Sequence, residues 1–121
     1  MGLADDIISF PNRFHQSKNI SFLSFLTDIG YFENYTLLSE EDIVEKLAEQ
    51  PTYVQDWLTW SEDRRAPSGW YFLKNEQKGY TVGYYPKNKE SFEAEYPDAL
   101  KACAAFIKRE AEAVRMNHRD I

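Results

Sequence analysis

The spacing of apolar residues changes after Pro67, and no other feature constrains the fold as strongly. Before this point apolar residues recur every three or four positions, as on one face of a helix. The clearest set is Phe22, Phe25, Leu26 and Ile29. After it, residues 69–74 and 79–85 form short aromatic-rich segments between turn residues, a pattern typical of strands. The sequence therefore predicts helices first and an antiparallel sheet afterwards.

The helical part is expected to cover residues 1–66 and to open with two helices. The first is predicted over residues 3–10, where Pro11 would end it because proline removes a backbone donor. The second is predicted over residues 21–29. Gly30 follows it and suits the left-handed conformation with which many helices end.

Two further helices are predicted before the strands. Ser39 and Asp42 have the spacing of a capping box, so a helix is expected over residues 39–49. Pro51 cannot extend that helix, but proline is favoured in the first turn of the next one. That next helix is expected to run to about Asp63.

The second half is predicted to be a β-meander over residues 68–96, followed by a long helix over residues 97–116. Apolar and acidic residues alternate over 92–96, as expected for a half-buried third strand. Helices, then a meander, then a helix give an α+β class. A chain of 121 residues has the length of one ordinary domain, so residues 1–121 are expected to form one unit.

Negative charge is concentrated in one stretch of the chain. Residues 33–63 contain nine acids and one base, a net charge of −8, whereas 13 bases and 11 acids elsewhere leave +2, which together give the −6 of the whole chain. Such a surface repels nucleic acid and attracts basic proteins. The partner is therefore expected to be a basic protein, with no direct contact to nucleic acid.

Composition indicates a cytoplasmic protein that requires no cofactor. The chain has one cysteine, Cys103, so it cannot form an internal disulfide. Its first residues lack the basic start and apolar run of a signal peptide, and no apolar run has the length of a membrane span. We expect a reducing compartment and no contact with a membrane.

A stripe of glutamates is the clearest candidate site. Glu41, Glu45 and Glu49 follow one another at intervals of four, so they share one face of the predicted helix. Like charges at this spacing cost a helix roughly 0.2–0.5 kcal/mol per pair. The stripe is either a solvated face that keeps the protein soluble or the binding surface for a basic partner.

Aromatic residues offer two more candidates. Trp60 belongs to an aromatic stripe that is expected to be core, but its neighbours Glu62 and Asp63 leave open a surface role as an anchor. The predicted hairpin carries rings on both faces, Tyr84 among them. Either the N-terminal helices cover its second face or that face is a contact surface.

Signals for catalysis are weak. Two histidines, His15 and His118, provide no metal-ligand spacing, so no metal site and no catalytic residue are predicted. Glu93 and Glu95 could form an acid/base pair on one strand, although exposed strand glutamates are far commoner. Aromatic strands also occur in RNA-binding sheets, but here the lysines cluster only at the turns. We expect a binding protein rather than an enzyme.

Three segments resemble small immunity proteins of bacterial polymorphic toxins, including those of contact-dependent growth inhibition. They are residues 67–72 (PSGWYF), 79–85 (GYTVGYY) and 99–110 (ALKACAAFIKRE), so the likeness covers about the C-terminal half. These motifs are structural and transfer no catalytic residue. The resemblance implies a protein that neutralises a cognate toxin by occluding it.

The resemblance and the charge pattern together suggest how binding would occur. Many such toxins are basic nucleases, and carboxylates can occupy the place of phosphates. The expected contact residues are Glu41, Glu45, Glu49, Glu62 and Asp63 for charge, with Trp60 and Tyr84 as anchors. The partner would be the C-terminal domain of the toxin. The alternative function is a cytosolic adaptor or regulatory module unrelated to toxins.

Overall fold

The computed structural model describes residues 2–17, 21–63, 69–75, 79–85 and 93–118. In chain order the helices of the first half are α1 (Leu3–Ile8), α2 (Phe10–Ser17), α3 (Phe22–Asp28), α4 (Tyr31–Asn34), the 3₁₀ helix η1 (Tyr35–Leu37), α5 (Glu40–Glu49) and α6 (Thr52–Asp63). The second half contains β1 (Gly69–Lys74), β2 (Tyr80–Tyr85), β3 (Glu93–Tyr96) and α7 (Ala99–His118). The predicted α+β class is confirmed.

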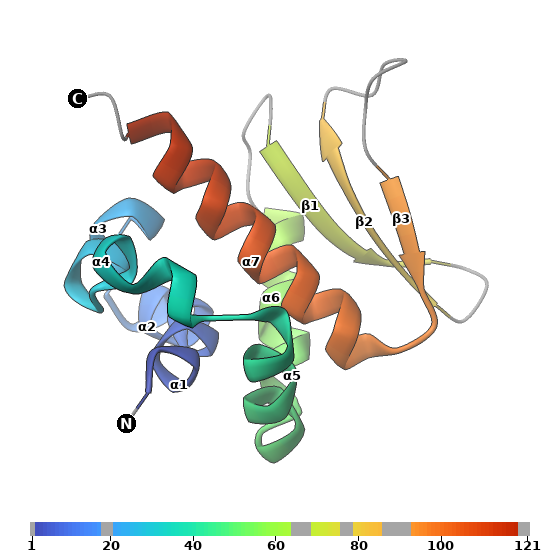
Figure 1. Cartoon of the computed structure of the whole chain (residues 1–121). Helices are drawn as coiled ribbons and strands as arrows, with labels where there is room; N and C mark the ends of the chain where they lie inside the picture. The colour runs from blue at the N-terminus through green and yellow to red at the C-terminus, as the bar shows by residue number, and fades with distance from the viewer. Residues whose placement is uncertain (1, 18–20, 64–68, 76–78, 86–92, 119–121) are drawn as a thin grey trace.

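The three strands form an antiparallel sheet in the order β1-β2-β3. Trp70 pairs with Tyr84 and Phe72 with Val82, while Val82 also pairs with Ala94 of β3. Side chains alternate between the faces of a sheet, so Trp70, Phe72, Val82 and Tyr84 share one face. Helix α7 packs against all three strands (Figure 1).

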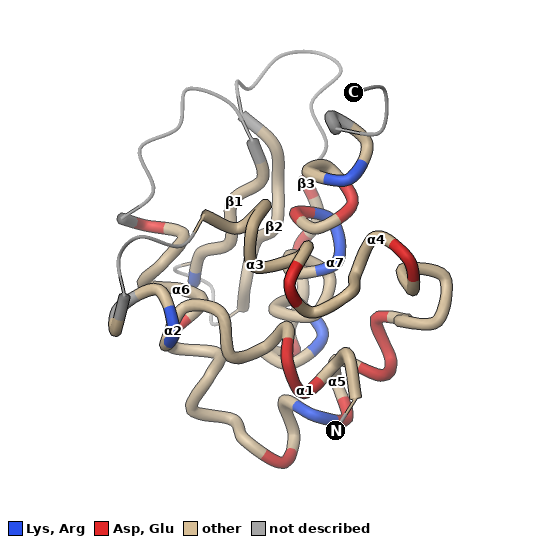
Figure 2. Tube along the Cα trace, turned by 90° about the vertical axis from the view of Figure 1, so that its left-hand side faces the viewer, with Lys and Arg blue, Asp and Glu red and all other residues tan. Residues whose placement is uncertain are grey.

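Helix α6 lies along β1. The backbone N–H of Phe72 donates to Ser61 Oγ of α6 at 2.9 Å. The Ser61 hydroxyl thus accepts the hydrogen bond that a neighbouring strand would otherwise accept. Helices α5 and α6 follow one another and are in contact, but α5 packs mainly on α7 and α1, whereas α6 packs mainly on β1. Figure 2 shows red acidic segments along α5.

The opposite face of the sheet is closed in part by Tyr71. Its ring lies across Gly83, and its hydroxyl donates to Glu93 Oε2 at 2.6 Å. A Cβ at position 83 would lie 2.3 Å from the Tyr71 oxygen, so only glycine allows this approach. Because Tyr71 is buried, its ring adds little to the Tyr-rich contact surface that the sequence suggested for this face.

Aromatic rings fill the core where α2, α3, α6 and α7 meet. Trp57 is fully buried, and its ring contacts Phe10, Phe22, Trp60 and Phe106. Its indole N–H donates to the carbonyl oxygen of Ile8 at 3.0 Å, so its polar atom is satisfied as well. The ring of Phe106 also stacks on Phe72, which joins the helical core to the sheet.

Local signals in the sequence set several helix ends as predicted. Ser39 Oγ accepts from the N–H of Asp42 and the Asp42 carboxylate accepts from the N–H of Ser39, both at 3.1 Å, which completes a capping box before α5. Gly30 follows α3 with a φ of 81°, in the left-handed region. Both local predictions are confirmed.

Other boundaries differ from the prediction. Pro11 does not end the opening helix, because α1 ends at Ile8 and Pro11 lies in the first turn of α2, where its missing N–H is tolerated. The C-terminal helix starts at Ala99 rather than at Pro97, since the Asp98 carboxylate accepts from the N–H groups of Leu100 and Lys101. The short helices α4 and η1 were not predicted.

Candidate protein-binding surface

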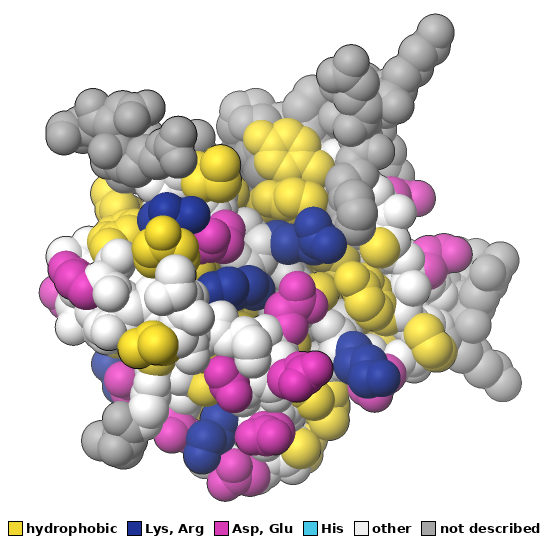
Figure 3. All heavy atoms as spheres, in the orientation of Figure 1, with side chains coloured by type: hydrophobic (Ala, Val, Ile, Leu, Met, Phe, Trp, Pro, Cys, Tyr) yellow, Lys and Arg dark blue, Asp and Glu magenta, His cyan; other side chains and the backbone are white. Residues whose placement is uncertain are grey.

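A groove with acidic walls runs between α5 and the junction of β3 with α7. We call it the acidic groove; its volume is about 500 Å³, and it is lined by Glu40, Glu41, Val44, Glu45, Tyr96 and Lys101. Val44 and Tyr96 give it an apolar surface, and Lys101 is the one base among the described residues that line it. Figure 3 shows acidic side chains gathered over α5 on this side of the molecule. The groove thus combines apolar contact area with negative charge.

The carboxylates of the groove are available to a partner. Glu40, Glu41 and Glu45 are exposed, and none of them forms a hydrogen bond or ion pair with another residue in the described part of the chain. The other acids of α5 are engaged. Asp42 caps the helix, and Glu49 pairs with Lys46 at 3.4 Å. Within α5, the carboxylates available for binding are therefore those of Glu40, Glu41 and Glu45.

The structure brings together only some of the predicted charged residues. Glu41 and Glu45 line one groove, whereas Glu49 lies outside this lining and is paired with Lys46. The hydrogen bond with Glu49, followed by the charge of Asp5, raises the pKa of Lys46. Glu62 is exposed near the C-terminal end of α6, the end that is distant in sequence from α5, and it is not among the lining residues of the groove. Asp63 is the last residue of α6, and its side chain lies outside the described part.

Trp60 packs in the core. Its ring contacts Phe10, Phe22, Trp57 and Phe106, with centroid distances between 5.5 and 6.1 Å. Trp60 is only partly buried, but its ring packs against the core, which favours the core interpretation of its stripe over a role as a surface anchor.

Tyr84 lines a second groove, between α7 and the face of β1 and β2. We call it the aromatic groove; its volume is about 510 Å³, and its lining residues are Glu40, Trp70, Tyr84, Lys108, Arg109, Glu112, Ala113 and Met116. The rings of Tyr84 and Trp70 meet edge to face at 5.3 Å. Glu40 lines both grooves, so they adjoin on one face of the protein.

Sequence reasoning missed most of the aromatic groove. Arg109, Ala113 and Met116 are spaced i, i+4 and i+7, which places them on one face of α7. This spacing could have been used to predict that the three side chains share one surface of the helix. The opposite wall could not be predicted, because it depends on how α7 packs across β1 and β2.

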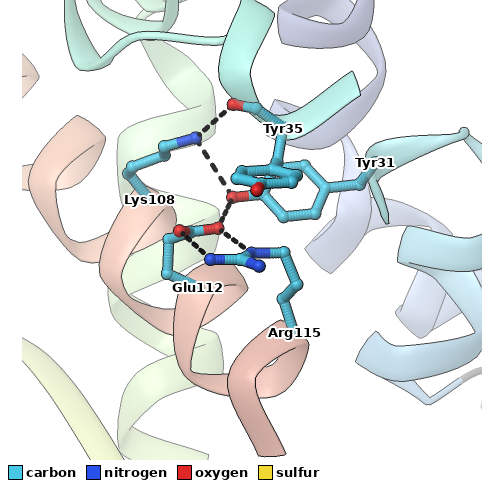
Figure 4. Close-up of polar contacts among 5 residues, drawn as sticks. All are labelled: Tyr31, Tyr35, Lys108, Glu112 and Arg115. Carbon is cyan, nitrogen blue, oxygen red and sulfur yellow. Dashed lines mark hydrogen bonds and ion pairs between the residues drawn. The ribbon is translucent and has the colours of Figure 1, made fainter. Parts of the chain in front are cut away.

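A polar cluster beneath the two grooves joins α4 and η1 to α7 (Figure 4). The buried Tyr31 donates its hydroxyl to Glu112 Oε2 at 2.6 Å, and Lys108 Nζ donates to the Tyr31 oxygen at 3.1 Å and to the Tyr35 carbonyl at 2.9 Å. Arg115 binds both carboxylate oxygens of Glu112, each at 2.9 Å. These internal bonds hold α4 and η1 against α7, which indicates a structural role.

The pKa values of the cluster follow from burial and from these bonds. Burial, and then the hydrogen bond to Glu112, raise the pKa of Tyr31 well above its ordinary value, so the phenol stays protonated. Burial also lowers the pKa of Lys108. For Glu112, burial would raise the pKa, but the hydrogen bonds from Arg115 and Tyr31 outweigh it and lower the pKa.

Replacing Tyr31 with Phe should reduce the free energy of unfolding by about 1–3 kcal/mol, because it removes a partner from two partly buried polar groups, Lys108 and Glu112. Glu112 stabilises the fold above its unfolded-state pKa, and this contribution is lost as pH falls through its lower folded-state pKa. The variant lacks one of the bonds that lower this pKa. Its acid unfolding should therefore begin at higher pH.

Urea titrations at several pH values measure both effects. Tyr35→Phe is the matched control, because the Tyr35 hydroxyl forms no hydrogen bond within the described residues. Equal losses of stability in the two variants would contradict the role assigned to the Tyr31 hydroxyl.

Further observations concern other kinds of site. Within the described residues, no group of three or more His, Cys, Asp or Glu side chains is placed to hold a metal ion. None of the described helices has both the length and the apolarity needed to cross a membrane. Comparisons with family models, with curated proteins and with solved structures gave no match. The features that bear on function are therefore the two grooves and the sequence itself.

Proposed function

We propose that this chain is an immunity protein, which binds the C-terminal domain of a cognate bacterial toxin and neutralises it by occlusion. The observation that carries the proposal is the acidic groove, where Glu40, Glu41 and Glu45 present unpaired carboxylates beside the apolar Val44 and Tyr96. Carboxylates next to apolar area suit lysine or arginine side chains, whose stems pack while their charges pair.

A basic nuclease is the toxin that this surface fits best. An enzyme that binds a phosphate backbone carries clustered Lys and Arg, and the acidic groove offers them the opposite charge. Attraction between the two surfaces would accelerate their encounter. Apolar contact at Val44 and Tyr96 would then slow dissociation. In this proposal the protein acts in the cytoplasm, performs no catalysis and requires no cofactor.

The test is growth of cells that express the C-terminal region of the protein encoded immediately upstream, with and without this chain. Expected results are arrest with the toxin region alone, growth with both chains, and a stoichiometric complex on size exclusion. A harmless upstream region, or arrest that this chain does not relieve, would contradict the proposal. An unbiased pull-down would then test the adaptor alternative.

A further inference from the structure

The aromatic groove has the form of a binding site for one large side chain. Its volume of about 510 Å³ lies within the roughly 300–1,000 Å³ of small-ligand sites. Rings of Trp70 and Tyr84 form one wall, and Met116, which is 54% exposed, contributes to the wall from α7. Aromatic and thioether groups favour contact with another ring. The apolar part of the groove therefore suits an aromatic side chain.

The aromatic groove is less acidic than the acidic groove. Among its described lining residues two bases, Lys108 and Arg109, stand against two acids, Glu40 and Glu112, whereas the acidic groove has one base against three acids. The carboxylate of Glu112 is also bound on both oxygens by Arg115. The Arg109 guanidinium lies 5.2 Å from the centroid of the Trp70 ring, so cationic charge sits directly beside the aromatic wall.

We infer that the aromatic groove binds an aromatic side chain of the partner protein that stands next to a carboxylate. The ring would pack against Trp70, Tyr84 and Met116, and the carboxylate would lie toward Arg109 and Lys108. This inference rests on the proposed function, because it takes the occupant to belong to the same partner that covers the acidic groove.

Adjoining grooves of unequal charge would also fix how the partner is oriented. Glu40 lines both of them, so one partner surface can cover both. A basic segment would lie over α5 and an aromatic residue with its acidic neighbour over the second half of α7. The reverse orientation would place the partner's acid against the three carboxylates of the acidic groove, and such like-charge contacts cost several kcal/mol.

Two small probes of the same ring and opposite charge test the groove without any partner. The whole chain is titrated with indole-3-propionate and, separately, with tryptamine, and ¹H–¹⁵N NMR follows the Trp70 indole N–H and the amides of Tyr84, Ala113 and Met116. We expect millimolar binding of the carboxylate probe here, at least about threefold tighter than that of tryptamine. Equal or tighter binding of tryptamine, or no shift with either probe, would overturn the inference.

Two variants of Met116 test the same preference for negative charge in the complex with the toxin region. Met116→Glu and Met116→Lys both replace the exposed thioether with an unbranched side chain that favours helix, so their main difference is the sign of the charge that they add. Affinity for the upstream toxin region should fall about tenfold or more in the Glu variant relative to the Lys variant. Equal affinities, or a larger loss in the Lys variant, would contradict an acidic neighbour in the partner.

Failure of this inference and failure of the proposed function give different results. If the proposed function is wrong, the wild-type chain does not bind the upstream region, and the probe titration still decides the chemistry of the groove. If only the inference is wrong, the wild-type complex forms and responds to changes in Glu41 and Glu45, but neither Met116 variant nor the probe charge affects binding.

Discussion

Replacing Glu41 and Glu45 together with lysine is expected to weaken binding of the toxin region by roughly a hundredfold, about 2.7 kcal/mol. Both carboxylates line the acidic groove without an internal partner, so the change turns attraction into repulsion at two points. Because attraction between exposed charges mainly accelerates association, the association rate should fall and lose most of its salt dependence. Surface plasmon resonance at two ionic strengths measures both quantities.

The chain provides its own control for this experiment. Glu49→Lys makes the same charge change on the same helix, but Glu49 lies outside the lining of the groove and pairs with Lys46. Its effect on affinity should stay within about threefold. A comparable loss in Glu49→Lys would show that net charge, rather than the groove, determines binding. Circular dichroism confirms that each variant is folded.

Replacing Trp57 with Ala is expected to lower the free energy of unfolding by about 3–5 kcal/mol, the range for large aromatic residues in a core. Trp57 is fully buried, contacts four rings and bonds the Ile8 carbonyl, so its loss leaves a cavity and an unpaired acceptor. Domains of this size are stable by roughly 5–15 kcal/mol, so the variant could lose most of its stability. Urea denaturation measures the change.

Trp57→Phe separates the two contributions. It keeps an aromatic ring in the cavity but removes the N–H that bonds Ile8, and its cost should be clearly smaller than that of Trp57→Ala. Trp60→Ala gives a further comparison, because Trp60 is only partly buried. It should cost less stability than Trp57→Ala and leave the affinity of the folded protein unchanged. Loss of affinity without loss of stability would restore Trp60 as an anchor.

The predictions from sequence were correct where neighbouring residues determine the backbone conformation. The capping box of Ser39 and Asp42 and the left-handed Gly30 depend on groups within a few residues, so they were visible in the printed sequence. Pro11 was misjudged because proline can either end a helix or begin one, and the choice depends on how α1 and α2 pack. Helices α4 and η1 are too short to show a period, and Tyr31 is fixed by Glu112 and Lys108 far along the chain.

The printed sequence was enough to predict the α+β class, the succession of helices, sheet and long helix, and the concentration of acids in residues 33–63. Hydrophobic period, caps and charge are properties of neighbouring residues, and no packing is needed to read them. Which acids act together depends on tertiary packing, which places Glu41 and Glu45 in one groove with Tyr96, pairs Glu49 with Lys46, and leaves Glu62 outside that groove. The physical reason is that a groove is formed by elements distant in sequence, whose relative position depends on how the whole core packs.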